Sequence, residues 1–256
     1  NELPTTMMAF SEAMLGLILT AVLIGYLPTM YTTFSRRERA VALLEVRAGS
    51  PPSAVEMLLR FSRIQGLDRL REQWTTWEEW FVDLDESHTS LAPLVFFRSP
   101  LPSRSWVTAA GAVLDAAALT ASTLDAPRDP QAELCIRAGS IALRRISDFF
   151  GITYDPNPRE DDPRHAERIS ITKAEFDAAY DQLAANGLAL KPDREQAWRD
   201  FAGWRINYDA VLIGLARLTM APEAPWSSDR LLGTKQAPVL PSLHLGKRRA
   251  RSMRET

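Results

Sequence analysis

The longest uninterrupted run of apolar residues lies near the start of the chain. Between Glu12 and Arg36, 23 residues carry no charge, and the large apolar side chains occupy every face of a helix rather than one stripe. A helix that rises about 1.5 Å per residue needs only about 20 residues to cross a hydrocarbon core of about 30 Å. Gly16, Gly25 and Pro28 weaken a helix in water but are tolerated in lipid, where no water competes for the backbone. The pattern therefore predicts a transmembrane helix.

Two alternatives to a membrane span remain for this stretch. A secretion signal has a basic segment before its apolar core and a small-residue cleavage site after it, whereas here no basic residue precedes Arg36 and no such site follows. A buried helix of a large soluble core is the more serious alternative, because leucine-rich helices of about 18 residues occur there. Apolar residues on all faces favour insertion into lipid over both alternatives.

The charges that flank the span predict its orientation. Arg36, Arg37 and Arg39 follow it directly, and no basic residue precedes it. By the positive-inside rule, residues 36–256 are then cytoplasmic, and the three arginines form a basic anchor at the membrane interface. We therefore expect a protein of the cell membrane, with the lipid bilayer as its first partner.

Small residues within the span predict neighbouring helices in the membrane. Ala21, Gly25 and Thr29 recur every four positions, which is the spacing that lets two helices approach closely in lipid. Together with Gly16 and Pro28 they are candidate hinge or packing positions, and they favour a homo-oligomer. The alternative is that these residues only provide spacing and flexibility, because the pattern is common in apolar helices.

After the arginines the pattern changes to amphipathic helices separated by Gly and Pro. Ser53 with Glu56, and Thr172 with Glu175, have the spacing of capping boxes. A strand-like alternation is confined to residues 168–172. The fold class expected is all-α, with one N-terminal transmembrane helix followed by a cytoplasmic multi-helix domain. The expected helices of that cytoplasmic part cover residues 37–48, 53–65, 67–87, 105–122, 130–150, 172–187 and 194–219.

These helices also set the expected domain boundaries. Residues 1–48 form the transmembrane helix and its cytoplasmic extension, because Gly49 and the prolines after it end the helix. Residues 49–230 form a helical cytoplasmic domain that is large enough to enclose a core. Residues 231–256 form a basic tail interrupted by proline, which we expect to be disordered. The chain starts with Asn1 rather than Met, which indicates a fragment or a processed product.

Composition narrows the classes of function. The net charge is -2, and the arginines of the folded part alternate with acids, so nothing points to nucleic acid as a partner. The single cysteine, Cys135, excludes an internal disulfide and a cysteine-based zinc site. The chain has no phosphate-binding glycine loop, G-x-S-x-G elbow or H-E-x-x-H motif. We therefore predict a protein that is not an enzyme and has no cofactor.

The densest polar segment, residues 78–88, is a candidate for metal binding. Asp85 and His88 stand three residues apart on a predicted helix, with Glu78 or Asp83 about one turn back, so these side chains can face the same way. A second helix with ligands would be needed to complete the site. The hypothesis that we prefer is a solvated acidic face in which His88 helps to end the helix, and no metal is predicted.

Five tryptophans lie on two predicted helices, Trp74, Trp77 and Trp80 on one, and Trp198 and Trp204 on the other. They either line a ligand pocket or belong to the core, and aromatic residues at helical spacing are more often core. Trp77 and Trp80 cannot both share the narrow seam of Trp74. One of the two is therefore expected at the membrane interface or against a partner subunit.

The N-terminal residues resemble a known family. The segment "NELPTTMMAFSEAMLGLILTAVLIGYLPTMYTTFSRRE" is similar to the part that follows the selectivity filter in bacterial two-helix channels of the potassium-channel superfamily. It has a short Pro-bearing link and then an inner helix with a glycine after its first acidic residue. The remainder, through "LLEVRAGSPPSAVEMLLR" and "ESHTSL", resembles the cytoplasmic domain of uncharacterised actinobacterial members. The resemblance places a hinge at Gly16 and a bend at Gly25 and Pro28. The filter would precede Asn1, so the resemblance says nothing of ion selectivity.

The resemblance implies a subunit segment of an oligomeric ion-channel-like membrane protein. Its helical cytoplasmic domain would assemble, regulate or sense, and a monovalent cation is the candidate ion. The second hypothesis is a single-span membrane-anchored binding or scaffold module without a pore. The third is an anchored metal-dependent enzyme that uses Asp83, Asp85 and His88.

Overall fold

The structure is a computed structural model that describes residues 3–158 and 165–231. Within these ranges it is helical and contains no β-strand, which confirms the all-α class. The α-helices are α1 (Leu3–Ala48), α2 (Ala54–Arg63), α3 (Leu70–Ser90), α4 (Trp106–Thr123), α5 (Pro130–Phe149), α6 (His165–Arg168), α7 (Lys173–Ala185), α8 (Arg194–Arg205) and α9 (Asp209–Leu218). Three 3-10 helices join them: η1 (Leu67–Arg69), η2 (Ala92–Phe96) and η3 (Ser228–Leu231).

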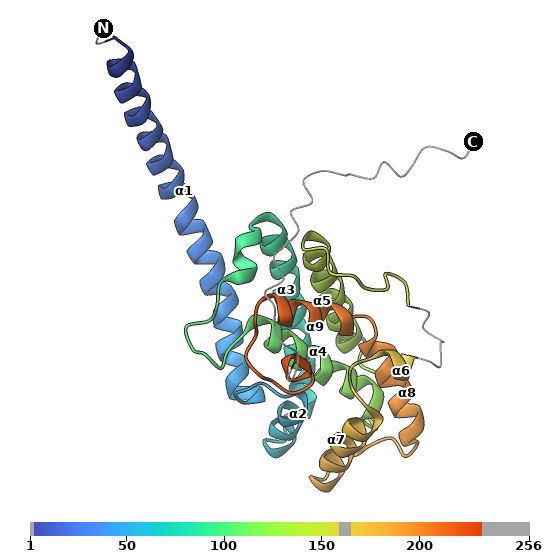
Figure 1. Cartoon of the computed structure of the whole chain (residues 1–256). Helices are drawn as coiled ribbons and strands as arrows, with labels where there is room; N and C mark the ends of the chain where they lie inside the picture. The colour runs from blue at the N-terminus through green and yellow to red at the C-terminus, as the bar shows by residue number, and fades with distance from the viewer. Residues whose placement is uncertain (1–2, 159–164, 232–256) are drawn as a thin grey trace, which may run out of the picture.

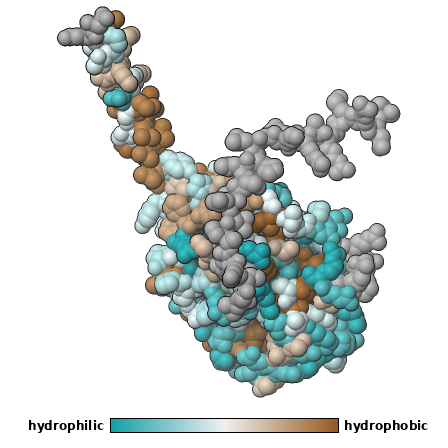
Figure 2. All heavy atoms as spheres, viewed as in Figure 1, coloured by the Kyte–Doolittle hydropathy of each residue, from teal (hydrophilic) through white to brown (hydrophobic). Residues whose placement is uncertain are grey.

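Helix α1 projects far out of the domain formed by the other helices (Figure 1). Its most apolar 18-residue window has a mean hydropathy of 2.0, and none of that window is buried. Figure 2 shows the apolar side chains gathered along this projecting part, while the visible face of the domain is largely hydrophilic. Among the described residues, α1 is the one helix that is long and apolar enough to cross a membrane by length and composition.

The C-terminal part of α1 belongs to the domain. Its buried residues recur at intervals of three, four or seven positions, the spacing of one helix face, and the last three of them join the hydrophobic core. The packed domain therefore begins before residue 49, inside the helix, with no linker between the apolar part and the core. At Gly49 the backbone turns to a φ of +84°, and the helix ends there as predicted. The buried residues of α1 are Met30, Arg37, Val41, Leu44 and Ala48.

Helices α3, α4 and α5 form the centre of the domain. Helix α4 is buried on nearly all sides, and its many alanines let its neighbours approach closely. Helix α5 packs along α3, and Gly139 of α5 faces the side chains of Phe81 on α3 and Leu114 on α4. A Cβ atom at Gly139 would lie 2.6 Å from Leu114 and 2.9 Å from Phe81. The close packing of these three helices therefore requires glycine at this position.

All three tryptophans of α3 are buried. Trp74, Trp77 and Trp80 are 0%, 3% and 6% exposed, which confirms that they belong to the core. The expectation that Trp77 or Trp80 reaches the membrane or a partner subunit is wrong. Helix α3 packs against α1 as well as α5, so more than one of its faces is covered. The indole N–H of Trp80 donates to the carbonyl of Arg37 on α1 at 3.4 Å.

The predicted single helix over residues 194–219 is two helices, α8 and α9. The chain turns between Arg205 and Asp209, with Tyr208 at a φ of -133°. In this turn the Tyr208 hydroxyl donates to Asp115 of α4 at 2.9 Å, and Arg205 still pairs with Asp209 four residues on. The buried polar contacts therefore override the helical pattern, which is continuous in the sequence.

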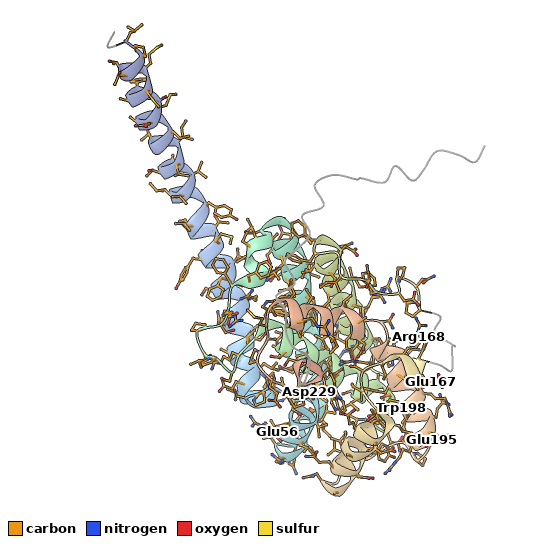
Figure 3. The ribbon with its side chains drawn as sticks, in the orientation of Figure 1. Glu56, Glu167, Arg168, Glu195, Trp198 and Asp229 are labelled. Atoms are coloured by element: carbon orange, nitrogen blue, oxygen red, sulfur yellow. The ribbon has the colours of Figure 1, made fainter. Side chains whose placement is uncertain are left out.

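Of the two predicted capping boxes, one is confirmed and the other is modified. Thr172 and Glu175 form the predicted capping box with both bonds present. At the start of α2, Ser53 accepts the N–H of Glu56, but the Glu56 carboxylate instead accepts from Arg60 at 2.6 Å. Figure 3 shows Glu56 beside α2, at the end of the domain away from the projecting part of α1.

The strand-like segment at residues 168–172 is no strand. Ile169 and Ile171 are buried in an irregular turn before α7. The predicted disorder of residues 231–256 concerns a segment that lies outside the described residues apart from Leu231, at the end of η3.

Candidate functional site at the base of helix α1

Arg37 lies where α1 enters the domain, and it is only 4% exposed. Its Nη1 donates to the carbonyl of Leu94 at 2.8 Å and to Nε2 of His88 at 3.0 Å. Its Nη2 donates to the carbonyl of Phe97 at 2.5 Å, and Nε and Nη2 both donate to the Glu38 carboxylate. The guanidinium fork therefore fastens α1 to the end of α3 and to the segment around η2.

His88 is the neutral partner in this junction. It lies on the last turn of α3 and is 1% exposed. Because Arg37 can only donate, Nε2 of His88 accepts, and Nδ1 carries the proton toward Ser87 Oγ at 3.0 Å. Burial, together with the charge of Arg37, lowers the pKa of His88 to about 3. The imidazole is thus uncharged at neutral pH.

The charge of Arg37 is only partly compensated. Burial lowers the pKa of Arg37, and the neighbouring Glu38 carboxylate opposes that shift. The rings of Phe34 and Trp106 lie 5.2 Å and 5.9 Å from the guanidinium carbon, within the range of cation–π attraction. The charge of Arg37 is therefore stabilised by one carboxylate, carbonyl oxygens, a neutral imidazole and two aromatic faces.

A second set of contacts fixes the end of α1. Arg60 of α2 donates to the carbonyls of Glu45 and Val46 at 3.1 Å and 2.7 Å. These carbonyls belong to the last turn of α1, where the helix itself supplies few donors, and that of Glu45 also accepts from the N–H of Gly49 at 3.0 Å. Arg104 pairs with the carboxylate of the same glutamate. The base of α1 is therefore held to the domain at two levels, about two turns apart.

The predicted basic anchor is divided between two environments. Arg36 pairs with Asp83 at 2.6 Å, with 72% of its side chain exposed, and Arg39 is also exposed. Arg37 requires a correction, because it is buried inside the domain and its guanidinium cannot reach lipid headgroups. Consecutive helical residues point about 100° apart, so only one of the two adjacent arginines faces the domain.

The predicted hinge and packing positions lie on the projecting part of α1. Ala21, Pro28 and Thr29 are exposed. A Cβ atom added at Gly16 or Gly25 would meet no atom within 4 Å. Pro28 lies inside the helix without ending it. The role of these five residues in hinging or packing stays a prediction.

The four side chains considered as metal ligands on α3 face different partners. No group of three His, Cys, Asp or Glu side chains within residues 3–158 and 165–231 is arranged to hold a metal. Each of the four is engaged by a basic or amide side chain from another helix. The partners are Arg36 for Asp83, Arg145 for Asp85, Arg37 for His88 and Gln131 for Glu78.

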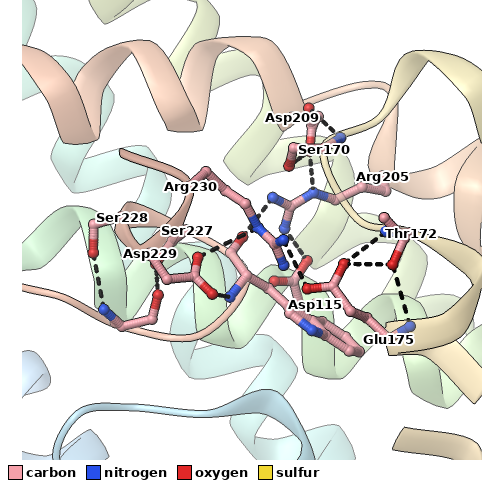
Figure 4. A network of polar contacts seen from close by, with 12 residues as sticks. Asp115, Ser170, Thr172, Glu175, Arg205, Asp209, Ser227, Ser228, Asp229 and Arg230 are labelled. Carbon is pink, nitrogen blue, oxygen red and sulfur yellow. Dashed lines mark hydrogen bonds and ion pairs between the residues drawn. The ribbon is translucent and has the colours of Figure 1, made fainter. Parts of the chain in front are cut away.

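Deeper in the domain, a second buried arginine organises α4, α8 and α9 (Figure 4). Arg205 is 0% exposed and pairs with Asp115 at 2.5 Å and with Asp209 at 2.7 Å. Its Nη2 also donates to the carbonyl of Trp226 at 2.7 Å. Burial disfavours the charge of Arg205, but the two carboxylates outweigh burial and raise its pKa above the usual value.

The same network reaches the segments that cover α8. Ser170 donates to Asp209 through its backbone N–H and its hydroxyl, at 3.0 Å and 2.7 Å. Arg230 of η3 pairs with Glu175 of α7 at 2.7 Å. The network therefore ties the turn before α7 and the last described segment to the centre of the domain.

A cavity of about 760 Å³ opens beside this network, between the end of α4, the start of α5, α6 and α8. Its lining carries both signs of charge, with Arg128, Lys191 and Arg199 against Asp129, Glu133 and Asp200. The sequence did not predict it, because its walls come from segments far apart along the chain. Of the five tryptophans considered for a pocket, Trp204 lines this cavity, while Trp198 and the three of α3 are buried in the core.

Comparison with known proteins identifies no relative. No model of a protein family matches the chain, and neither a curated protein nor a solved structure matches it. The geometry of α1 and its base is therefore the main guide to function.

Proposed function

We propose that the chain is a subunit segment of an oligomeric ion-channel-like membrane protein. Helix α1 crosses the cell membrane as an inner helix, residues 36–256 face the cytoplasm, and the helical domain regulates or senses. The observation that carries this proposal is the unbroken course of α1 from its exposed apolar part into the core of the domain. No linker separates the two parts, so the domain moves together with the helix.

The junction gives this coupling a physical basis. A tilt of α1 relative to the domain would break the bonds from Arg37 to Leu94 and Phe97 and withdraw Val41 and Leu44 from the core. A ligand or partner of the domain can shift α1 only if it binds two arrangements of the protein with different affinity. The junction is the place where such arrangements would differ.

The proposed oligomer is supported by the resemblance and by the surface of α1. The proposed ion is supported by the resemblance alone. Ala21, Gly25 and Thr29 stand free on the projecting helix, as expected of positions that pack against other copies in lipid. A monovalent cation is the proposed permeant ion. No catalytic step and no cofactor are part of the proposal.

The test is reconstitution of the full-length protein in liposomes, with measurement of oligomeric mass and of potassium and sodium flux. We expect an oligomer that conducts. Arg37→Met is expected to change the flux at unchanged oligomeric mass, because it loosens the domain from the helix. Arg217→Met, which removes an exposed arginine of α9, serves as the matched control and should leave the flux unchanged.

A second candidate function is a single-span anchored binding module without a pore. The cavity of about 760 Å³ favours it, because its volume is within the range of small-molecule sites. A monomer, or an oligomer without flux across pH, voltage and salt, would overturn the channel proposal in favour of this module. Gly203→Leu then tests the cavity, since a Cβ at this lining position meets no atom within 4 Å and the larger side chain fills the space.

A further inference from the structure

A row of aromatic rings lies at the end of the domain from which α1 rises. Phe34 of α1 and Phe97 have ring centroids 5.9 Å apart. Phe96 of η2, the neighbour of Phe97 in the chain, has its ring 5.4 Å from that of Phe150, and Phe150 lies 5.0 Å from Phe149 at the end of α5. We call Phe96, Phe97, Phe149 and Phe150 the phenylalanine rim.

The rim exposes much apolar surface. Phe96, Phe97 and Phe149 are 44%, 43% and 60% exposed, while Phe150 is partly buried beneath them and packs on the core. Single exposed apolar residues are common on soluble proteins, but a contiguous group indicates a contact with a protein or a membrane. We therefore expect the exposed rings of the rim to be covered by a membrane or by another protein.

The position of the rim along α1 indicates which occupant fits. Phe34 is the second-last residue before Arg36, at the cytoplasmic end of the uncharged stretch. Phe97 lies beside it, and its carbonyl accepts from Arg37 at 2.5 Å. If α1 crosses a bilayer, the rim lies at the level of the headgroups, where aromatic rings are favoured.

The charges around the rim are balanced. Arg98 follows Phe97 in the chain and Asp148 precedes Phe149, while Asp83 and Asp85 of α3 pair with Arg36 and Arg145. The surface therefore lacks the cluster of free basic residues that would select anionic lipids. Its chemistry fits the boundary between headgroups and acyl chains of a bilayer, with little dependence on lipid charge.

We propose that the phenylalanine rim rests in the lipid interface and holds the domain against the membrane. This inference rests on the proposed crossing of the membrane by α1. The domain then contacts the bilayer at two places, the helix and the rim. Contact of the rim with the membrane limits the tilt of the domain. The domain can then still rotate about the axis of α1.

The test uses spin labels on the full-length protein in phosphatidylcholine nanodiscs. Phe96→Cys and Phe149→Cys each label one rim position and leave the other rim residues in place. Leu19→Cys reports the span, and Ala184→Cys reports exposed surface on α7, at the far end of the domain (Figure 1). The native Cys135 is buried and does not compete for the label. Collisions with oxygen, which concentrates in lipid, are compared with collisions with a water-soluble nickel chelate.

The expected result is an oxygen-to-nickel collision ratio severalfold higher at positions 19, 96 and 149 than at 184, unchanged when phosphatidylglycerol is added. A high ratio at 19 alone overturns the rim contact while the membrane crossing of α1 stands. A low ratio at all four positions overturns both. Shielding of positions 96 and 149 from both reagents, with dipolar broadening between labels, shows a second copy on the rim and overturns the lipid contact.

A second variant tests whether the rim side chains cause the contact. In the Phe149→Cys background, Phe96→Gln with Phe97→Gln is expected to lower the collision ratio at 149 severalfold. Leu134→Gln changes a residue of α5 that is 50% exposed and outside the rim, and it should leave the ratio unchanged. An equal response to both changes would overturn the proposal.

Discussion

Arg37 and Arg205 are both buried arginines, yet the two regions that they hold are built differently. Arg205 lies between two carboxylates, Asp115 and Asp209, in the centre of the domain. Arg37 lies at the base of α1 against one partly accessible carboxylate, carbonyl oxygens and the neutral His88. Their pKa values move in opposite directions, upward for Arg205 and downward for Arg37.

This difference indicates that the contacts around Arg205 resist opening more strongly than those around Arg37. Two carboxylates compensate the charge of Arg205, and removing any member leaves the others buried and unpaired. The charge of Arg37 is held mainly by hydrogen bonds, and Glu38 beside it can be hydrated when the contact opens. We therefore expect the junction between the projecting helix and the domain to open before the centre of the domain does.

The largest effect is expected for Arg205→Met. The change leaves Asp115 and Asp209 as buried charges without a partner, which costs about 3–5 kcal/mol in the free energy of unfolding. Urea unfolding of the full chain in detergent, followed by tryptophan fluorescence, measures this loss. Arg217→Met, at an exposed position of α9, is the control and should cost under about 0.5 kcal/mol. A variant as stable as wild type would show that the network does not hold the domain.

Arg37→Met is expected to cost less, about 2–3 kcal/mol, because it leaves the carbonyl of Phe97 without a donor and that of Leu94 with only the N–H of Phe97, while Glu38 regains water. The same unfolding assay measures this cost. Arg37→Lys keeps the charge but not the fork, and we expect an intermediate value. If Arg37→Met lowered the free energy of unfolding as much as Arg205→Met, the junction would be as resistant to opening as the centre of the domain, which would contradict the prediction.

Acidification is expected to weaken the junction through His88. Its pKa is lowered to about 3 in the folded protein, so between pH 6.5 and 3 the unfolded chain binds a proton that the folded chain does not. Stability is therefore unaffected above pH 6.5 and falls by about 1.4 kcal/mol per pH unit below it, down to the folded pKa.

The measurement for this prediction compares wild type with His88→Gln, because the carboxylates of both proteins respond to acid in the same way. The amide oxygen of glutamine can accept from Arg37 but does not titrate. The difference in unfolding free energy between the two proteins should therefore shift in favour of the variant as the pH falls from 6.5. Parallel pH profiles would contradict a buried neutral imidazole.

The smallest effect is expected for Arg36→Ala. Its pair with Asp83 has 72% and 38% of the two side chains exposed, so solvent and salt screen it. The change should cost about 0–1 kcal/mol, and raising the salt concentration should remove the difference. A loss similar to that of Arg37→Met would mean that the exposed arginine also fastens α1.

The local elements could be predicted from the sequence, because their signals lie within one or two helical turns. The uncharged stretch before Arg36 predicted the projecting helix, and Gly49 predicted its end. Thr172 and Glu175 predicted a cap that is formed as expected. These features depend on backbone conformation and on the hydropathy of neighbouring residues, which the order of the residues determines by itself.

Only the tertiary structure decided how the charges are paired. Arg37 looked like one of three membrane-facing arginines, and His88 like part of a solvated acidic face, until packing of α1 on α3 buried both and brought them within 3.0 Å. The turn after Arg205 likewise depends on Asp115, 90 residues away along the chain. The cavity and the phenylalanine rim also join distant segments. Such contacts have no signal in a local pattern, because the energy of burying a charge or a ring depends on which element covers it.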